Sequence, residues 1–217
     1  MRLKATLTTT MILIATASAA AIAQDKVGLY LYGDRQQRGG EAIAQETAHL
    51  HVFDGCKVKA YDQSQIWAND TCQVEAYGNS LVYAFANAKI RAFDNTRIVA
   101  TNLAQIDANG SCNVIADQHV NVNAHGNASV HAEDECVVTA DGNCTVFAQK
   151  KSKVTASGNC IVMAINDSEI TASGHVHVKA YENAKVNAKD DVVIEAWGKN
   201  VHVIAEGGAK VEKKQVE

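Results

Sequence analysis

The chain has 217 residues, contains no proline, and has an aromatic content of only 6%. Its net charge of −4 is spread evenly along the sequence, which excludes the basic footprint of a nucleic-acid-binding protein. After removal of a leader peptide, the remaining length suits one domain.

Residues 1–23 are predicted to be a secretory signal peptide. Arg2 and Lys4 supply the charged start, residues 11–23 are apolar, and Ala21–Ala23 gives a small-residue cleavage site. A membrane anchor is the alternative, but this run is too short to cross roughly 30 Å of hydrocarbon. We therefore expect an exported protein, periplasmic or at the surface of a bacterium, whose mature chain has no membrane span.

Residues 24–46 come before the repeats described below. Val27–Tyr32 is expected to be a strand, Gly33 and Asp34 a turn, and the polar segment Arg35–Glu46 a helix. Solenoid proteins expose an apolar end that needs a cap. We interpret residues 24–46 as this cap, with a separate binding element as the alternative.

Thr47–Gly198 divides into nineteen consecutive units of eight residues, without insertion or deletion. The second position of each unit is Ala, Cys, Ser, Thr or Val, the fourth is aliphatic, and the sixth is Ala except at Val52. Apolar residues that alternate with polar ones indicate a β-strand, and a short fixed period indicates a repeat architecture. Each unit is therefore predicted to be a short strand followed by a turn.

Alternate units end differently. Every sixteen residues the eighth position is Gly or Asp, as in Asp62, Gly78 and Asp94, whereas the intervening turns are merely polar, as in Lys150-Lys151. Two different corners predict a coil of two strands and sixteen residues. The fold class is therefore all-β, a two-sheet parallel β-solenoid of about ten coils over residues 47–211, roughly 50 Å long. One extra residue near Lys199 shifts the frame, and residues 212–217 form a charged tail.

All six cysteines occupy the second position of a unit, which faces the core. We predict that they are free and act as small buried apolar residues. Two disulfides, Cys56–Cys72 and Cys144–Cys160, are the alternative, because these pairs stack one coil apart.

Few residues suggest chemistry. No catalytic or nucleotide-binding motif is present, and a regular rod offers no obvious pocket, so no enzymatic activity and no cofactor are expected. The pairs His49/His51 and His175/His177 lack a third ligand, so no metal site is expected. Stacked aromatic residues at Tyr61, Tyr77 and Phe93 are predicted to shield the turn, with sugar binding as the alternative.

The two outer faces differ in polarity. One is predicted to be a solvated surface, whereas the other carries a row of apolar side chains that is long for a monomer. Residues 24–46 are too short to cover the whole row, so we predict an interaction face. Its predicted members are Trp67, Leu81, Tyr83, Val99, Ile115, Phe147, Ile161 and Met163.

The recurring unit, as in Ala76–Ala84, resembles the repeats of GIN-type, autotransporter-adhesin-head-like β-helices of bacterial envelopes. The resemblance implies a non-catalytic, adhesin-like exported module. We expect it to bind an envelope protein, a glycan or a second copy of itself through the apolar face. The alternative is a carbohydrate-binding or polysaccharide-degrading β-helix, and a third possibility is end-to-end assembly.

Overall fold

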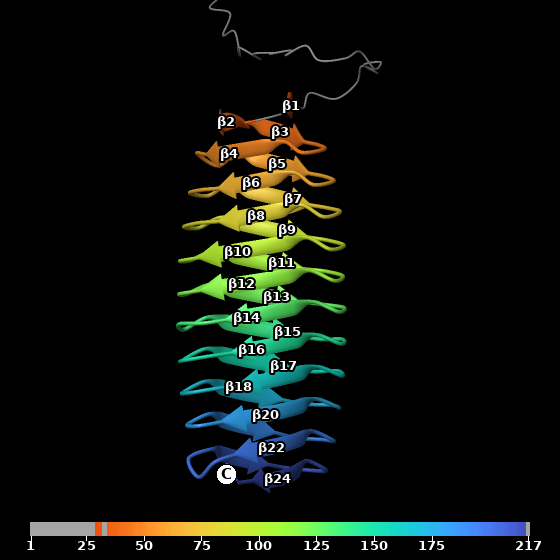
Figure 1. The fold of residues 1–217 in the computed structure, drawn as a ribbon, viewed down its shortest axis with the longest axis vertical. Helices are drawn as coiled ribbons and strands as arrows, with labels where there is room; N and C mark the ends of the chain where they lie inside the picture. Colours follow the sequence, from red (N-terminus) through yellow and green to blue (C-terminus); the bar gives the residue numbers. More distant parts are fainter. Residues whose placement is uncertain (1–28, 32–33, 216–217) are drawn as a thin grey trace, which may run out of the picture.

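The computed structural model describes residues 29–31 and 34–215, and its regular elements there are all β-strands. Successive strands alternate between two parallel twelve-stranded sheets. The chain winds through about 11 turns of roughly 16 residues and forms a long rod (Figure 1). The expected signal peptide, residues 1–23, and residues 24–28 of the expected cap lie outside the described residues.

Sheet A contains the odd-numbered strands and sheet B the even-numbered ones. Sheet A comprises β1 (Leu29–Leu31), β3 (Glu41–Ala44), β5 (Lys57–Ala60), β7 (Gln73–Ala76), β9 (Lys89–Ala92), β11 (Gln105–Ala108), β13 (Asn121–Ala124), β15 (Val137–Ala140), β17 (Lys153–Ala156), β19 (Glu169–Ala172), β21 (Lys185–Ala188) and β23 (His202–Ala205). Sheet B comprises β2 (Asp34–Arg38), β4 (His49–Phe53), β6 (Gln65–Ala68), β8 (Leu81–Ala84), β10 (Arg97–Thr101), β12 (Asn113–Asp117), β14 (Ser129–Ala132), β16 (Thr145–Ala148), β18 (Ile161–Ala164), β20 (His177–Tyr181), β22 (Val193–Trp197) and β24 (Lys210–Lys214).

The register confirms the predicted fold class. Each strand pairs in parallel with the strand one turn away, so Ala76, Ala92 and Ala108 stack directly within sheet A. All three are fully buried. A triangular coil of 24 residues would have separated them. The extra residue near Lys199 also appears, since Lys185 pairs with His202, one position beyond the usual step of sixteen.

The solenoid begins earlier than predicted. Strand β2 pairs with β4, and β3 pairs with β5. The expected helix over Arg35–Glu46 is wrong: Gly39 and Gly40, with φ of 60° and 74°, turn the chain between two short strands. Both strands find the open edge of a neighbouring coil, and ladder hydrogen bonds outweigh weak local helix propensity. This early start accounts for about 11 turns where about ten were expected.

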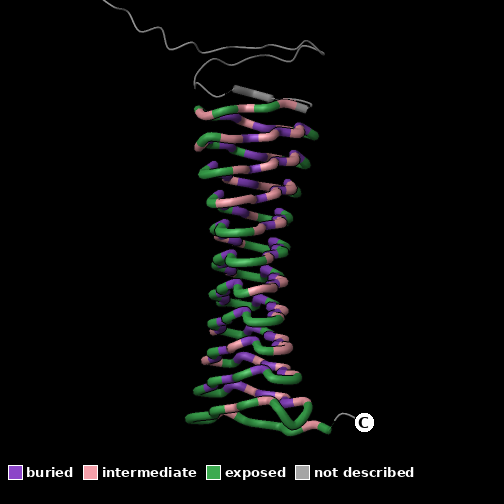
Figure 2. Tube along the Cα trace, turned by 90° about the vertical axis from the view of Figure 1, so that its left-hand side faces the viewer, coloured by how far each residue is buried: buried purple, intermediate pink, exposed green. Residues whose placement is uncertain are grey.

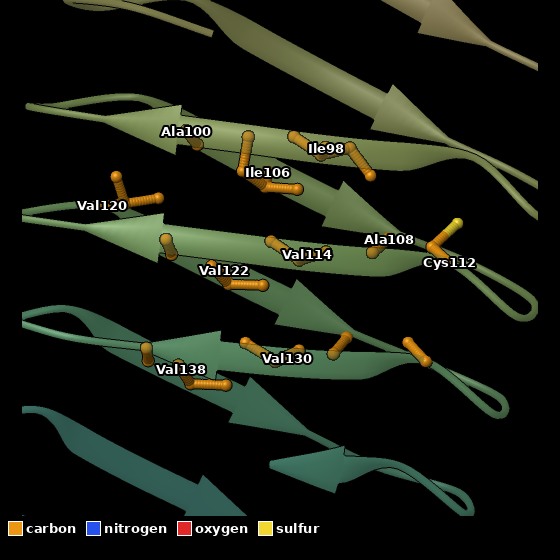
Figure 3. Close-up of a cluster of buried hydrophobic side chains, with 14 of the residues drawn as sticks. Ile98, Ala100, Ile106, Ala108, Cys112, Val114, Val120, Val122, Val130 and Val138 are labelled. Atoms are coloured by element: carbon orange, nitrogen blue, oxygen red, sulfur yellow. The ribbon is translucent and has the colours of Figure 1, made fainter. Parts of the chain in front are cut away.

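The interior is narrow and apolar. Aliphatic residues at the fourth position form one column in each sheet, for example Ile98, Val114 and Val130 in sheet B (Figure 3). These three side chains are at most 1% exposed, and the alanines at the sixth position of the repeat are at most 4% exposed. Because the side chains are small, much of the stability comes from the stacked ladders and the contacts between adjacent coils.

In several units the side chain at the second position has a specific hydrogen-bonding role, whereas other units have Ala or Val there, and the buried Ser64 and Ser168 hydroxyls have no partner among the described residues. The Thr96 and Ser152 hydroxyls each donate to the carbonyl three residues earlier, at 2.7 Å, and the Cys160 thiol does the same at 3.0 Å. A small side chain with a donor thus fills the end of the core and satisfies a corner carbonyl. This explains why Cys, Ser and Thr replace one another at this position.

The prediction that the cysteines are free and buried is confirmed for all six. Burial raises the pKa of Cys56 to about 12 and that of Cys112 and Cys136 to about 11. In the stacked pair, the hydrogen bond with Cys160, together with burial, raises the pKa of the Cys144 thiol. The thiols of Cys56, Cys112, Cys136 and Cys144 are therefore protonated and unreactive in the folded protein at neutral pH, whereas the same hydrogen bond lowers the pKa of Cys160.

Both corners share one backbone conformation, contrary to the predicted difference. Asp62 and Lys150, which end units on opposite sides of the coil, have φ of 61° and 55°. What distinguishes the glycine corner is close stacking. A Cβ on Gly142 would lie 2.9 Å from the Gly126 carbonyl oxygen, and one on Gly158 would lie 2.8 Å from that of Gly142. Glycine is thus required at this corner for two reasons: the backbone of the neighbouring coil leaves no room for a Cβ, and the positive φ favours glycine.

The last turn differs from the others in its burial. Ala205 and Val211 occupy positions that are buried in earlier coils, yet both are exposed (Figure 2). At the position paired with Ala196, strand β24 carries Lys213 instead of a small apolar residue. The apolar core therefore ends at this turn within the described residues.

Candidate functional site

The predicted interaction face lies on the outer surface of sheet B. Ladder pairing aligns the fifth positions of successive strands into one continuous row, beginning with Trp67 opposite Tyr83. Neighbouring side chains are one strand spacing apart, so the row follows the rod axis. In order, it consists of Trp67, Tyr83, Val99, Ile115, His131, Phe147 and Met163.

The members of this row differ in exposure. Ile115 is 47% exposed, whereas the aromatic members and Met163 are half-buried. Leu81 and Ile161 stand beside the row at the third position, where Ile161 is 48% exposed. Their own ladder neighbours are polar, for example Arg97 next to Leu81. The structure thus brings the predicted residues together as one row with two flanking side chains five coils apart.

The aromatic rings of the row cover one another. The Trp67 ring lies between His51, at a centroid distance of 4.5 Å, and Tyr83, at 5.2 Å, with interplanar angles of 6° and 15°. The rings on the opposite sheet behave alike: Tyr77 stacks on Tyr61 at 5.1 Å. Ring edges therefore face solvent, while ring faces are already occupied. The predicted stack of Tyr61, Tyr77 and Phe93 is confirmed. The stacking of Trp67 on His51 and Tyr83 was not predicted, although the spacing of sixteen residues between aromatic residues was the signal for it.

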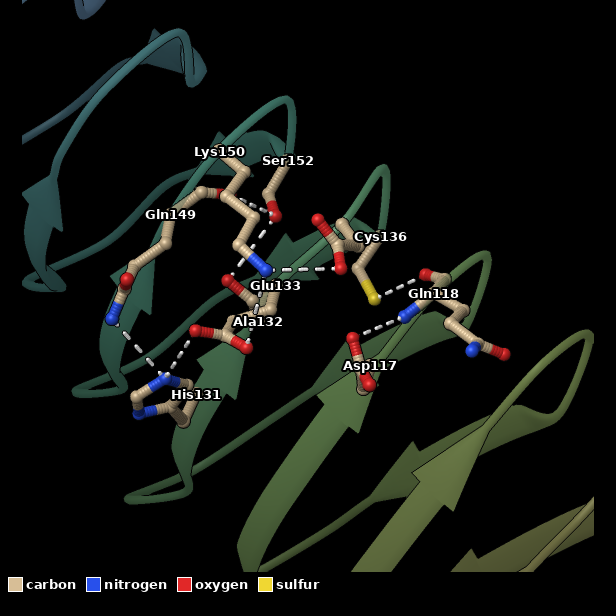
Figure 4. Close-up of polar contacts among 10 residues, drawn as sticks. Asp117, Gln118, His131, Ala132, Glu133, Cys136, Gln149, Lys150 and Ser152 are labelled. Atoms are coloured by element: carbon tan, nitrogen blue, oxygen red, sulfur yellow. Dashed lines mark hydrogen bonds and ion pairs between the residues drawn. The ribbon is translucent and has the colours of Figure 1, made fainter.

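His131 is the polar member of the row, and a neighbouring corner holds its ring. Nε2 lies 3.4 Å from the Gln149 side chain and 4.0 Å from Glu133 (Figure 4). The Lys150 ammonium also pairs with Glu133, at 3.8 Å. His131 therefore divides the row into one apolar part from Trp67 to Ile115 and a second apolar part around Phe147.

The described residues of the N-terminal segment do not cover the row. Residues 34–46 form β2, β3 and their corners at the end of the rod, where β2 extends sheet B beyond β4. The row from Trp67 to Met163 lies on strands β6–β18, farther along the rod axis than β2 and β3. Residues 29–31 and 34–46 therefore give no support to the idea that the N-terminal segment folds over the row.

Ion pairs between successive coils neutralise much of the surface charge. On the corner of Figure 4, Lys150 pairs with Asp134 at 3.0 Å. Nearby, Lys151 pairs with Glu135 at 3.3 Å, and His119 lies 3.1 Å from the same carboxylate. These groups border a shallow hollow of ≈ 520 Å³. Carboxylates occupied by cations one coil away are poor candidates for general acid–base chemistry.

Neither a metal centre nor a spanning helix emerges from residues 29–31 and 34–215. No group of three or more His, Cys, Asp or Glu side chains there is placed to hold a metal ion. In the same part of the chain, no helix has the length and apolar character needed to cross a membrane.

Comparisons of the chain with protein-family models, with curated proteins and with solved structures found no match.

Proposed function

We propose that this protein is a non-catalytic, exported, adhesin-like structural module that docks a protein partner through the outer face of sheet B. The observation that supports the proposal is the row of outward side chains from Trp67 to Met163, which is apolar except at His131. Single exposed apolar side chains are common on protein surfaces, but a contiguous row rimmed by polar residues is typical of an interaction site.

The size of the row supports an interface core rather than a whole interface. Six strand spacings of ~4.8 Å and a four-residue strand width of ~13 Å give roughly 380 Å² for the outer face along the row, an upper bound for its apolar area because most third positions there are polar. The largest apolar patch on a monomer is commonly about 300–600 Å² and often functional. Because a standard interface buries about 800 Å² per partner, flanking polar side chains must contribute to the rim.

The alternative, a carbohydrate-binding or polysaccharide-degrading β-helix, receives less support on this face. Stacked rings such as Trp67 and Tyr83 present edges, whereas a sugar ring packs on an open aromatic face. The adhesin-like character and the export of the chain, to the periplasm or the cell surface of a bacterium, form part of the proposal through the sequence pattern of residues 1–23 and the resemblance of the repeats.

Self-association is the form of docking that can be tested directly. The mature chain, starting at Gln24, is measured by size-exclusion chromatography with light scattering over a range of concentrations. We expect a mass above that of the monomer, and we expect Tyr83→Ser/Phe147→Ser to return it to the monomer with unchanged β-sheet circular dichroism. Aromatic residues are favoured as interface hot spots, so these two should dominate the energy.

Val137→Ser is the matched control, because Val137 is 44% exposed on the outer face of the opposite sheet. Its mass profile should equal that of the parent chain. A parent chain that stays monomeric at high concentration would overturn docking to a second copy. Equal effects of the control and the double variant would show that sheet B has no special role.

A further inference from the structure

A trough runs along the outer face of sheet A, opposite the apolar row. It has a volume of ≈ 1030 Å³, and the strand backbones at the fourth position form its floor, from Ala42 to Ile106. Because the strands run across the rod, the trough follows the rod axis, over five strand spacings or about 24 Å from β3 to β13. One wall is the third-position row, Glu41, Lys57, Gln73, Lys89, Gln105 and Asn121; the other is the fifth-position row, Ile43, Lys59, Glu75, Arg91, Asp107 and Asn123.

The fifth-position wall is neutralised internally. Glu75 lies 3.7 Å from the Lys59 ammonium and 3.4 Å from the Arg91 guanidinium. Asp107 lies 4.0 Å from Arg91 on the next strand. Charges of alternating sign thus satisfy one another along this wall, and their oxygens remain partly exposed as hydrogen-bond acceptors.

The third-position wall has an excess of donors. Lys57 and Lys89 are exposed, and no ion pair to either occurs among residues 29–31 and 34–215. Amide side chains occupy the alternate positions, with Gln73 between the two lysines and Gln105 after them. Two unpaired ammonium groups are therefore two coils apart on one wall, a distance of ~9.6 Å between their strands.

We propose that this trough binds a linear acidic polysaccharide that lies along the rod axis. The two lysines match anionic groups that recur about every 10 Å, as in a glycan with one carboxylate on alternate sugars. The amides and the partly exposed Glu75 and Asp107 match hydroxyl groups, which both donate and accept hydrogen bonds. The chain thus has two binding faces, and this proposal does not depend on docking through sheet B.

Charge density separates this ligand from a nucleic acid. Duplex DNA carries one negative charge per ≈ 1.7 Å of its axis, and a protein that binds it neutralises several adjacent phosphates. The trough instead places Glu75 between its cations and has Glu41 and Asp107 towards its ends. A sparsely charged, hydroxyl-rich polymer fits this pattern, whereas a dense polyanion is repelled by the carboxylates.

The same wall provides a matched control farther along the rod. Lys153 and Lys185 occupy the third position of β17 and β21, two coils apart like the trough lysines. Both are already paired, because Glu169 lies 3.6 Å from Lys153 and 3.3 Å from Lys185. The hydrogen bond from Lys185, together with the charges of both lysines, lowers the pKa of Glu169. Removing these two lysines changes the net charge equally but spares the trough.

The test measures binding of a fluorescent hyaluronan oligosaccharide, which has one carboxylate per disaccharide, to the mature chain and two variants. Neutral dextran and a thymidine oligonucleotide serve as comparison ligands. We expect salt-sensitive binding of hyaluronan and weaker or no binding of the other two. Lys57→Gln/Lys89→Gln should weaken hyaluronan binding about tenfold, a few-fold for each solvent-screened contact, while Lys153→Gln/Lys185→Gln stays within about twofold.

Three results would overturn the proposal. The first is no binding of hyaluronan even at low salt, and the second is an equal loss in both double variants, which would indicate a general charge effect. The third is tighter binding of the oligonucleotide than of hyaluronan. Light scattering of the same variants separates this result from docking through sheet B, because neither lysine pair lies on that sheet.

Discussion

Replacing Gly158 by alanine tests whether the close stacking of corners limits the sequence of the solenoid. Gly158 has φ of +73°, and a Cβ there would lie 2.8 Å from the Gly142 carbonyl oxygen and 3.0 Å from its nitrogen. Both atoms belong to the backbone, so they cannot move without shifting a whole corner. Gly55 is the matched control: its φ is +72°, but its nearest neighbour is the Thr71 hydroxyl at 3.4 Å.

The two substitutions share one cost and differ in another. Alanine in the left-handed region costs about 1–2 kcal/mol at either position. Overpacking against the neighbouring backbone adds about 1–3 kcal/mol at Gly158 alone. Gly158→Ala should therefore lower the free energy of unfolding by roughly 2–5 kcal/mol, and Gly55→Ala by about 1–2 kcal/mol.

Thermal unfolding followed by circular dichroism measures the difference. At ~2–4 °C per kcal/mol for a chain of this size, Gly158→Ala should melt roughly 4–20 °C below the parent and Gly55→Ala roughly 2–8 °C below it. Equal melting temperatures of the two variants would refute the reasoning. In that case φ alone would explain the glycines, and the corner spacing of the solenoid would impose no further constraint.

Three further predictions concern the core. Ala92→Leu should overpack the narrow interior and cost at least ~1–3 kcal/mol, because Ala92 is fully buried between Ala76 and Ala108; an unchanged melting temperature would contradict this. The cysteines should resist thiol reagents at pH 8 until denaturant is added, and oxidised pairs or early reaction would show that they are not sealed in the core. Burial raises the pKa of Cys56 to about 12 and that of Cys112 to about 11, whereas both thiols have a pKa of 9.0 in the unfolded chain. Their contribution to stability is therefore complete below pH 9.0 and is lost as the pH rises through the folded pKa values. Melting temperatures measured over a series of pH values test this.

The core and the number of residues per coil could be predicted from the sequence because one constraint recurs in every unit. A side chain at the fourth or sixth position is buried in the same surroundings in almost every unit. Val74 and Ala76 therefore indicate the same strand register as Val186 and Ala188. In a stack of identical layers, a fixed step of sixteen residues translates directly into neighbours in space. The single extra residue near Lys199 could be recognised in the sequence for the same reason, because it shifts this fixed step.

The ends and the surface were less predictable, since the repeat does not constrain them. Strand β2 pairs with β4 at a step of fifteen residues and does not follow the octad pattern. Residues 39–46 do follow it, with Ala42 and Ala44 buried and the usual step of sixteen to β5, so the repeat begins one unit earlier than predicted. On the surface, the sequence indicated which side chains point outward but not what they touch. The Trp67 ring is covered by two neighbours, whereas Lys57 has no ion partner among the described residues, and neither fact follows from the alternation of polar and apolar residues.

The terminal coils favour lateral contacts over end-to-end assembly. If β24 of one copy met β2 of the next in the register of the ladder, Lys214 would lie opposite Arg38 on the outer face, while Lys210 would lie opposite Asp34. Inside, Val211 would meet Arg35, which occupies the inward position paired with Leu50. Like charges in direct opposition and an inward-pointing charge are features by which sheet proteins prevent edge-to-edge pairing. Lateral binding on the long sides of the rod, as proposed for the apolar row of sheet B and the trough of sheet A, is therefore expected rather than end-to-end assembly.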